Sequence, residues 1–192
     1  MTKPPHDPLE NNLSPLKDLE DDASGSGPVV EWMTPDSIPE PLRRLLEHPN
    51  DMTSTLEKYH GGEIVLKILA LHENGDTLKR KVLLQVESSG KTVEYGAIRI
   101  ILDRFPQEAR NLITGCRIPL GSIMDKFNLP HQNSPTRYFR ILADPQITLH
   151  LNIADNYWLY GRCNTITDDE GSTMAEVVEI LPPLDGEDLP DS

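Results

Sequence analysis

The chain has 192 residues and a formal net charge of −13, with 37% hydrophobic and 26% charged residues. Its length suits one domain with tails, and these proportions are those of a soluble globular protein. Nucleic acids and anionic membranes bind basic surfaces, so the strong acidity argues against both as the main partner.

Much of this negative charge lies near the two ends. Residues 1–30 carry a net charge of −4, and residues 183–192 carry another −4. Residues 1–30 are also rich in Pro, Asp, Glu, Ser and Gly, a composition that buries too little apolar surface to offset the entropy of ordering. The sequence therefore predicts a disordered acidic tail at 1–30, a folded domain at 31–182 and an acidic tail at 183–192.

Several familiar site types are missing from the sequence. The two cysteines, Cys116 and Cys163, fit no zinc-ligand spacing and indicate free thiols in a reducing compartment. The N-terminus lacks the apolar stretch of a signal peptide, and no run is long enough to span a bilayer. There is no Gly-rich phosphate loop, nucleophile elbow or His/Cys cluster. We expect a cytoplasmic protein with no metal and no cofactor; catalysis by Cys163 stays open, although cysteines are more often simply buried.

The expected elements begin with two helices. Leucines at helical spacing predict a short amphipathic helix over residues 41–48. A second helix is expected over residues 54–60, with Ser54 as its N-cap and Glu57 as the capping-box partner. The pair Gly61-Gly62 would end it.

Strands with short connections follow. Runs rich in Val, Ile and Leu predict strands at 63–72, 78–87 and 92–102, joined by the turns at Asn74-Gly75 and Ser88–Lys91. Helices are expected at 106–113 and 117–127. Further strands are expected at 137–142, 157–166 and 173–181, with an additional candidate at 147–151. Because short connections imply antiparallel pairing, we predict an α+β domain: a six-stranded antiparallel sheet with helices packed on it.

Two charged residues interrupt apolar rows of these strands. A side-chain period of two places Arg80 on one face with Val82 and Leu84. The same alternation places Glu179 with Val177 in the last strand. A carboxylate in an apolar row needs a partner, and Arg80 is the natural candidate. Alternatively, both side chains face a polar ligand.

A series of short motifs carries a resemblance to a known family. In chain order they are Asp51-Met52-Thr53, Arg80-Lys81-Val82-Leu83-Leu84, Gly96, Pro119-Leu120-Gly121, Tyr160-Gly161-Arg162 and Glu179-Ile180-Leu181-Pro182. Over about residues 40–182 the chain resembles the chorismate pyruvate-lyase-like family. The resemblance implies a six-stranded antiparallel sheet with helices packed on it. It also implies an enzyme that removes the enolpyruvyl group of chorismate as pyruvate and leaves 4-hydroxybenzoate, without cofactor or metal.

The resemblance assigns roles by position. It implies that Arg80 holds a substrate carboxylate and that Glu179 is the acid at the ether oxygen where the bond breaks. Leu120 and Gly121 would contact the ring, and Met52 and Thr53 would line the pocket. Chorismate is a dianion, for which a planar, bidentate guanidinium is a suitable partner.

One departure weakens the match. The bacterial lyases have a second pocket arginine directly after the strand glycine, where this chain has Ala97. We expect Arg99, two residues along on the same face, as the replacement. The alternative function is a non-catalytic binding module for a small aromatic carboxylate. A third possibility, an interaction protein acting through its acidic tails, would leave Arg80 and Glu179 unexplained.

Overall fold

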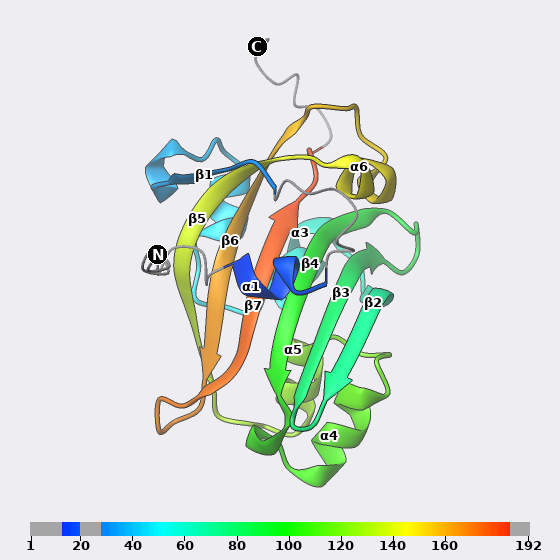
Figure 1. Ribbon diagram of the computed structural model, residues 1–192, viewed down its shortest axis with the longest axis vertical. Helices are drawn as coiled ribbons and strands as arrows, with labels where there is room; N and C mark the ends of the chain where they lie inside the picture. Colours follow the sequence, from blue (N-terminus) through cyan, green and yellow to red (C-terminus); the bar gives the residue numbers. More distant parts are fainter. Residues whose placement is uncertain (1–12, 20–27, 185–192) are drawn as a thin grey trace, which may run out of the picture.

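A computed structural model describes residues 13–19 and 28–184, which form one curved antiparallel sheet with helices on both faces (Figure 1). The described residues give a seven-stranded sheet in the order β1-β5-β6-β7-β4-β3-β2. The strands are β1 (Val30–Met33), β2 (Ile64–Asn74), β3 (Thr77–Val86), β4 (Thr92–Ile101), β5 (Gln132–Leu142), β6 (Trp158–Thr167) and β7 (Thr173–Leu181). The predicted α+β class and antiparallel pairing are confirmed.

All six strands of the predicted sheet are present, and the seventh is β1. This short strand pairs with β5 at the edge of the sheet and was not expected from the sequence. The hairpin at Asn74-Gly75 forms as predicted, with Gly75 at a φ of +57°. Glycine adopts that left-handed conformation most readily because it has no Cβ, which suits Gly75 to the turn that joins β2 and β3.

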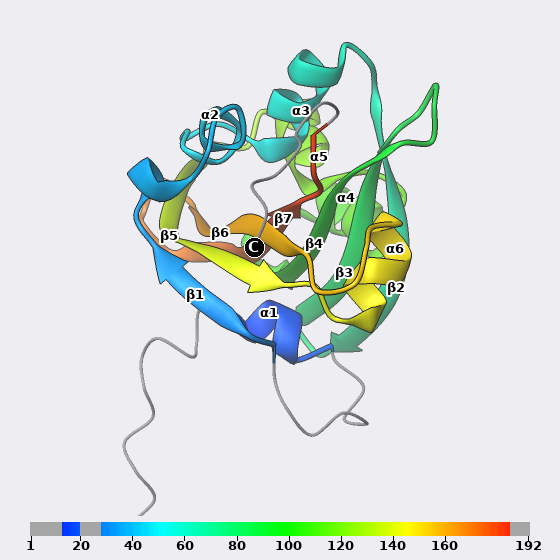
Figure 2. The ribbon, with the colours of Figure 1, turned by 90° about the horizontal axis from the view of Figure 1, so that it is seen from above.

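The helices lie on the two faces of the sheet. Seen from above, α2 (Leu42–Leu46), α3 (Met52–His60) and α5 (Leu120–Lys126) cover one face (Figure 2). On the other face lie α1 (Ser14–Lys17) and α6 (Pro145–Leu151). The helix α4 (Gln107–Thr114) follows β4 and packs beside α5. None of the helices in the described ranges is long and apolar enough to cross a membrane.

Two helix predictions were wrong in detail. Helix α3 begins at Met52 after Asp51, not after Ser54, whose hydroxyl instead donates to the Asp51 carbonyl at 3.0 Å. Glu57 is no capping partner, because its Oε1 accepts from the Ile64 N–H at 3.2 Å. The candidate strand at 147–151 is part of α6; its alternation of apolar and polar residues is typical of a strand, but over five residues it also places Ile147 and Leu151 on one face of a helix.

The start of α6 shows why this segment is helical. The Asp144 side chain accepts a hydrogen bond from the Ile147 N–H at 2.8 Å, and Pro145 occupies the first helical position. Ile147 and Leu151, one turn apart, are the two buried residues of this helix. Ile147 and Leu151 form the apolar face by which α6 packs on the sheet, whereas Leu149 is exposed.

The predicted N-terminal tail is only partly described, and there it is not disordered. Residues 13–19 contain α1, whose Leu13 and Leu16 are buried in the core beside β4 and β7. The prediction of one disordered tail over 1–30 is therefore wrong for this segment, since two leucines three residues apart bury enough surface to dock it. Residues 1–12, 20–27 and 185–192 of the two predicted tails lie outside the described residues.

Candidate functional site

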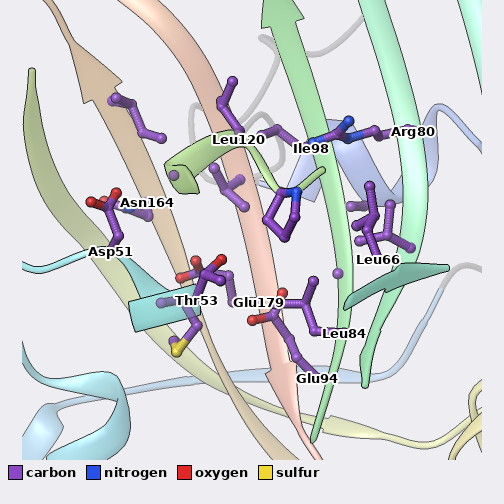
Figure 3. A pocket seen from close by; sticks show the side chains of 18 of the residues that line it. Asp51, Thr53, Leu66, Arg80, Leu84, Glu94, Ile98, Leu120, Asn164 and Glu179 are labelled. Carbon is purple, nitrogen blue, oxygen red and sulfur yellow. The ribbon is translucent and has the colours of Figure 1, made fainter. Parts of the chain in front are cut away.

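A pocket lies between the sheet and the helices α3 and α5 (Figure 3). Its floor is formed by β3, β4, β7 and β6, and its roof by the first residues of the two helices. The cavity has a volume of about 60 Å³. A water needs about 10–15 Å³ and the known benzene-binding cavity in another protein has about 150 Å³, so an aromatic ligand requires the roof to move outward.

The floor is organised by the register of four neighbouring strands. Arg80 on β3 pairs with Ile98 on β4, Ile98 pairs with Val177 on β7, and Val177 pairs with Asn164 on β6. Residues directly opposite each other in antiparallel strands point to the same face. The row therefore has a cation at one end, an amide at the other and two apolar side chains between them.

Arg80 is buried, with 2% of its surface exposed, and it lines the pocket. Its Nε and Nη1 have no hydrogen-bond partner among the described residues. Burial lowers the pKa of Arg80, and electrostatic and side-chain hydrogen-bond interactions with Cys116 raise it. Guanidinium groups still stay charged near neutral pH, so the pocket contains a desolvated cation with free donors.

Glu179 also lines the pocket, but its partner is not Arg80. The Arg162 Nε donates a short hydrogen bond to Glu179 Oε2, and the two residues are directly opposite each other on β6 and β7. Arg162 is fully buried, and its Nη1 donates to the carbonyl oxygens of Leu46 and His48 at 2.9 Å. The expected pairing of Arg80 with Glu179 is wrong, because Arg162 already satisfies the carboxylate.

A second carboxyl group in the pocket, that of Glu94, was missed by the sequence analysis. Glu94 is 4% exposed, and its Oε2 has no hydrogen-bond partner among the described residues. Burial raises the pKa of Glu94 well above its ordinary value of 4.5, the negative charge of Glu179 raises it further, and Arg162 opposes the shift. The shift favours the protonated form of Glu94, which keeps its proton to higher pH than an ordinary glutamate.

Gly96 explains how the two carboxyl groups come together. It is directly opposite Glu179 in the sheet, and a Cβ at Gly96 would lie 2.6 Å from Glu94 Oε1. The Glu94 carboxyl group thus folds over Gly96 toward β7, in space that any other residue would fill. Figure 3 shows Glu94 and Glu179 at one end of the pocket and Arg80 toward the other.

The roof contains the residues that the resemblance placed there. Met52 and Thr53 at the start of α3, and Leu120 and Gly121 at the start of α5, line the pocket. Asp51 precedes α3 without capping it, because its Oδ1 accepts from Asn133 at 3.0 Å and its Oδ2 lies 3.3 Å from His131 Nε2. The first N–H groups of α3 therefore lack a side-chain cap next to the pocket.

The two positions considered for a second arginine do not supply one. Arg99 does not line the pocket, and its guanidinium pairs with Glu176. Ala97 borders the pocket, but its side chain packs with Tyr95 in the core that also contains α1 and α6. Alternation along β4 explains both results, since residues 94, 96 and 98 face the pocket and residues 97 and 99 face away. The expectation for Arg99 is wrong.

Cys163 belongs to the core on the far face of the sheet. Burial raises the pKa of its thiol to about 12, which leaves almost no thiolate near neutral pH. A role for Cys163 as a nucleophile is therefore not supported.

Comparisons with known proteins place the chain by fold. No protein-family model matches the sequence, and no curated protein matches it. The crystal structure of PhnF from Mycobacterium smegmatis is similar, with a TM-score of 0.53 and 10% identity over 71% of this chain and 65% of PhnF. The PhnF effector domain alone gives a TM-score of 0.53 and 10% identity, covering 69% of this chain and 88% of that domain. A GntR-family transcriptional regulator from Bacillus cereus has a TM-score of 0.47 and 15% identity, and the match covers 67% of this chain and 98% of the regulator.

The two PhnF similarities establish the fold. The chain spans about two thirds of full-length PhnF, in agreement with the match to its effector domain. The effector-domain fold is the chorismate-lyase-like one that the sequence motifs implied. At these identities the similarity does not extend to a ligand or an activity.

Proposed function

We propose that the pocket binds a small aromatic carboxylate through Arg80, and that the protein is a chorismate pyruvate-lyase producing 4-hydroxybenzoate. The observation that carries the proposal is the buried guanidinium of Arg80, whose Nε and Nη1 lack partners among the described residues. Two unsatisfied N–H groups on a buried cation are costly, and a ligand carboxylate would give the Arg80 guanidinium an anionic partner that accepts from at least one of them.

The charges of the pocket fit this assignment. Glu179 forms an ion pair with Arg162, and the raised pKa of Glu94 favours its neutral form. Arg80 is therefore the one charged group of these four without an ion-pair partner among the described residues. One carboxylate of chorismate would bind Arg80. The second would lie at the start of α3, where the N–H groups of Met52 and Thr53 have no side-chain cap. That position would do the work of the arginine absent at 97.

The carboxyl pair matches the two proton transfers of the elimination. The ether C–O bond breaks and its electron pair leaves on the enolpyruvyl oxygen, which takes up a proton. The neighbouring ring carbon loses a proton, the ring becomes aromatic, and the released enol converts to pyruvate. Glu94, whose raised pKa favours the protonated form, would donate at the ether oxygen. Glu179, which accepts a hydrogen bond from Arg162, would take up the ring proton, in place of the acid role that the resemblance implied for it. No other reactant is needed.

A second candidate function is binding without turnover. It is favoured by the lack of a second pocket arginine and by the fold, which is shared with the effector domain of PhnF. In this case the pocket would hold an aromatic monocarboxylate such as 4-hydroxybenzoate, whose single charge matches Arg80 alone.

Incubation of the purified protein with chorismate separates the two functions. The lyase predicts equal amounts of pyruvate and 4-hydroxybenzoate, lost in Arg80→Met and reduced at least about 100-fold in Glu179→Gln and Glu94→Gln. Arg99→Met, on the far face of the sheet, is the control and should retain activity. Wild-type protein that makes no product would exclude the lyase.

Binding of 4-hydroxybenzoate tests the broader proposal by calorimetry. We expect wild type and Arg99→Met to bind and Arg80→Met to lose at least about tenfold in affinity, since a charge-assisted hydrogen bond is removed. Binding without turnover would leave the binding module as the function. Equal affinities of wild type and Arg80→Met would remove the basis of both.

A further inference from the structure

A chain of hydrogen bonds fixes the orientation of one amide at the end of the pocket opposite Arg80. Asn133 Nδ2 donates to Asp51 Oδ1 at 3.0 Å, and Asn164 Nδ2 donates to Asn133 Oδ1 at 2.9 Å. A carboxylate oxygen can only accept, so Asn133 must turn its NH₂ group to Asp51 and its carbonyl oxygen to Asn164. Asn164 in turn must direct its NH₂ group to Asn133, which leaves its own Oδ1 facing elsewhere.

The Oδ1 atom of Asn164 is a buried acceptor in the pocket. Asn164 is 3% exposed and lines the pocket, and its Oδ1 has no hydrogen-bond partner among the described residues. No described residue donates to this oxygen and its burial separates it from bulk solvent, although buried carbonyl groups almost always have a partner. The relay through Asn133 prevents the amide from rotating to present its NH₂ group instead.

The position of Asn164 relative to Arg80 defines the shape of a ligand. Both belong to the row that crosses β3, β4, β7 and β6, with Ile98 and Val177 between them. Three strand spacings separate their Cα atoms by about 14 Å. The side chains of Arg80 and Asn164 both extend toward the centre of this row, which shortens the distance between the guanidinium and the amide. The space between these two groups suits one ring with polar groups at opposite ends, lying on the apolar side chains of Ile98 and Val177.

We infer that Asn164 is a specificity-determining residue whose Oδ1 accepts a hydrogen bond from a hydroxyl group on the ligand, para to the carboxylate that Arg80 binds. This inference rests on the proposed function, because Arg80 sets the orientation of the ligand. It adds a chemical requirement: the far end of the ligand must be a hydrogen-bond donor. An analogue with only an acceptor there would leave two acceptors facing each other in a dry site.

A series of para-substituted benzoates tests the requirement on the unmodified protein, by calorimetry. We expect 4-hydroxybenzoate and 4-aminobenzoate, which both donate, to bind about 10- to 100-fold more tightly than 4-methoxybenzoate and 4-fluorobenzoate, which do not. Benzoate should bind as weakly as the fluoro analogue. Equal affinities across the series, with loss of all of them in Arg80→Met, would overturn the inference and leave the proposed function standing.

Asn164→Leu tests whether the Asn164 side chain recognises the hydroxyl group of the ligand. The variant should bind 4-hydroxybenzoate and 4-fluorobenzoate with affinities that differ by less than about threefold, because leucine offers no acceptor. The exposed Asn111→Leu on α4 is the matched control and should keep the wild-type preference. An unchanged preference in folded Asn164→Leu would overturn the inference. Failure of every benzoate to bind wild type would contradict both the inference and the proposed function.

Discussion

Arg80 and Arg162 are two buried arginines on the same face of the sheet, and their surroundings differ. Arg162 is fully buried and has Glu179 and two backbone carbonyl oxygens as partners, with only Nη2 unsatisfied among the described residues. Arg80 is 2% exposed, and its Nε and Nη1 have no partner in the same part of the chain. Burial alone therefore does not separate a structural cation from a ligand-binding one; the completeness of its hydrogen bonds does.

The same comparison explains what each arginine does to the fold. Arg162 joins β6 to the segment after α2, because it binds the carbonyl oxygens of Leu46 and His48 and holds Glu179 on β7. Among the described residues Arg80 has no carboxylate or carbonyl partner of this kind, and the neighbour that acts on its pKa is Cys116. We expect substitutions at the two positions to divide sharply between stability and binding.

The largest effect on stability is expected from Arg162→Met. Without the guanidinium, Glu179 and two carbonyl oxygens lose their partner in a buried site, and breaking a buried ion pair costs about 3–5 kcal/mol. The free energy of unfolding, measured in urea, should fall by that amount. A loss below about 1 kcal/mol would show that Arg162 has no structural role and would remove the contrast.

An intermediate effect is expected from the pH dependence that Glu94 confers. Its pKa is higher in the folded protein than its ordinary 4.5, so above about pH 4.5 the unfolded chain loses this proton while the folded protein retains it. Its contribution to stability is therefore present at acid pH and decreases as pH rises from 4.5 toward the folded pKa, by up to about 1.4 kcal/mol per pH unit.

Glu94→Gln should remove this decrease, because glutamine has a similar shape and does not titrate. The measurement is the unfolding free energy of both proteins between pH 4.5 and 8. Parallel curves for wild type and variant would contradict a raised pKa at Glu94.

The smallest effect is expected from Arg80→Met. Methionine fills similar space and removes a desolvated charge with two unsatisfied donors, so the unfolding free energy should stay level or rise by about 1 kcal/mol. If Arg80→Met keeps its unfolding free energy and loses binding of 4-hydroxybenzoate, Arg80 serves ligand binding and does not contribute to stability. A fall of 3 kcal/mol or more would instead make Arg80 equivalent to Arg162.

The strands that form the pocket floor could be predicted well from the sequence. The alternation of side chains around Arg80 and Glu179 and the turn at Asn74-Gly75 depend only on neighbouring residues, so they can be recognised in the sequence. Helix α1 and strand β1 could not be predicted in this way. Both are short, and their stability comes from docking on a sheet assembled from distant residues, as the burial of Leu16 at 2% exposure shows.

Which residues line the pocket was easier to predict than which of them form hydrogen bonds or ion pairs with each other. Six of the seven expected site residues line the pocket, and Arg99 fails because one step along β4 reverses the face. The pairing of Arg162 with Glu179 can be derived from the sequence, because folding the β6–β7 hairpin about its turn places these two residues opposite each other. Glu94 gave no such signal, since its burial depends on α3 covering β4 and on the space left by Gly96.

The close approach of α3 and α5 has a consequence for the rate of binding. A Cβ added at Gly121 would lie 3.3 Å from the Asp51 Cβ, so the two helix starts are in close contact above the pocket, whose cavity is about 60 Å³. If an aromatic ligand enters by separating these helix starts, association is slower than an ordinary encounter. In stopped-flow mixing, the observed rate should therefore level off at high ligand concentration, and the plateau value would report how often the roof opens.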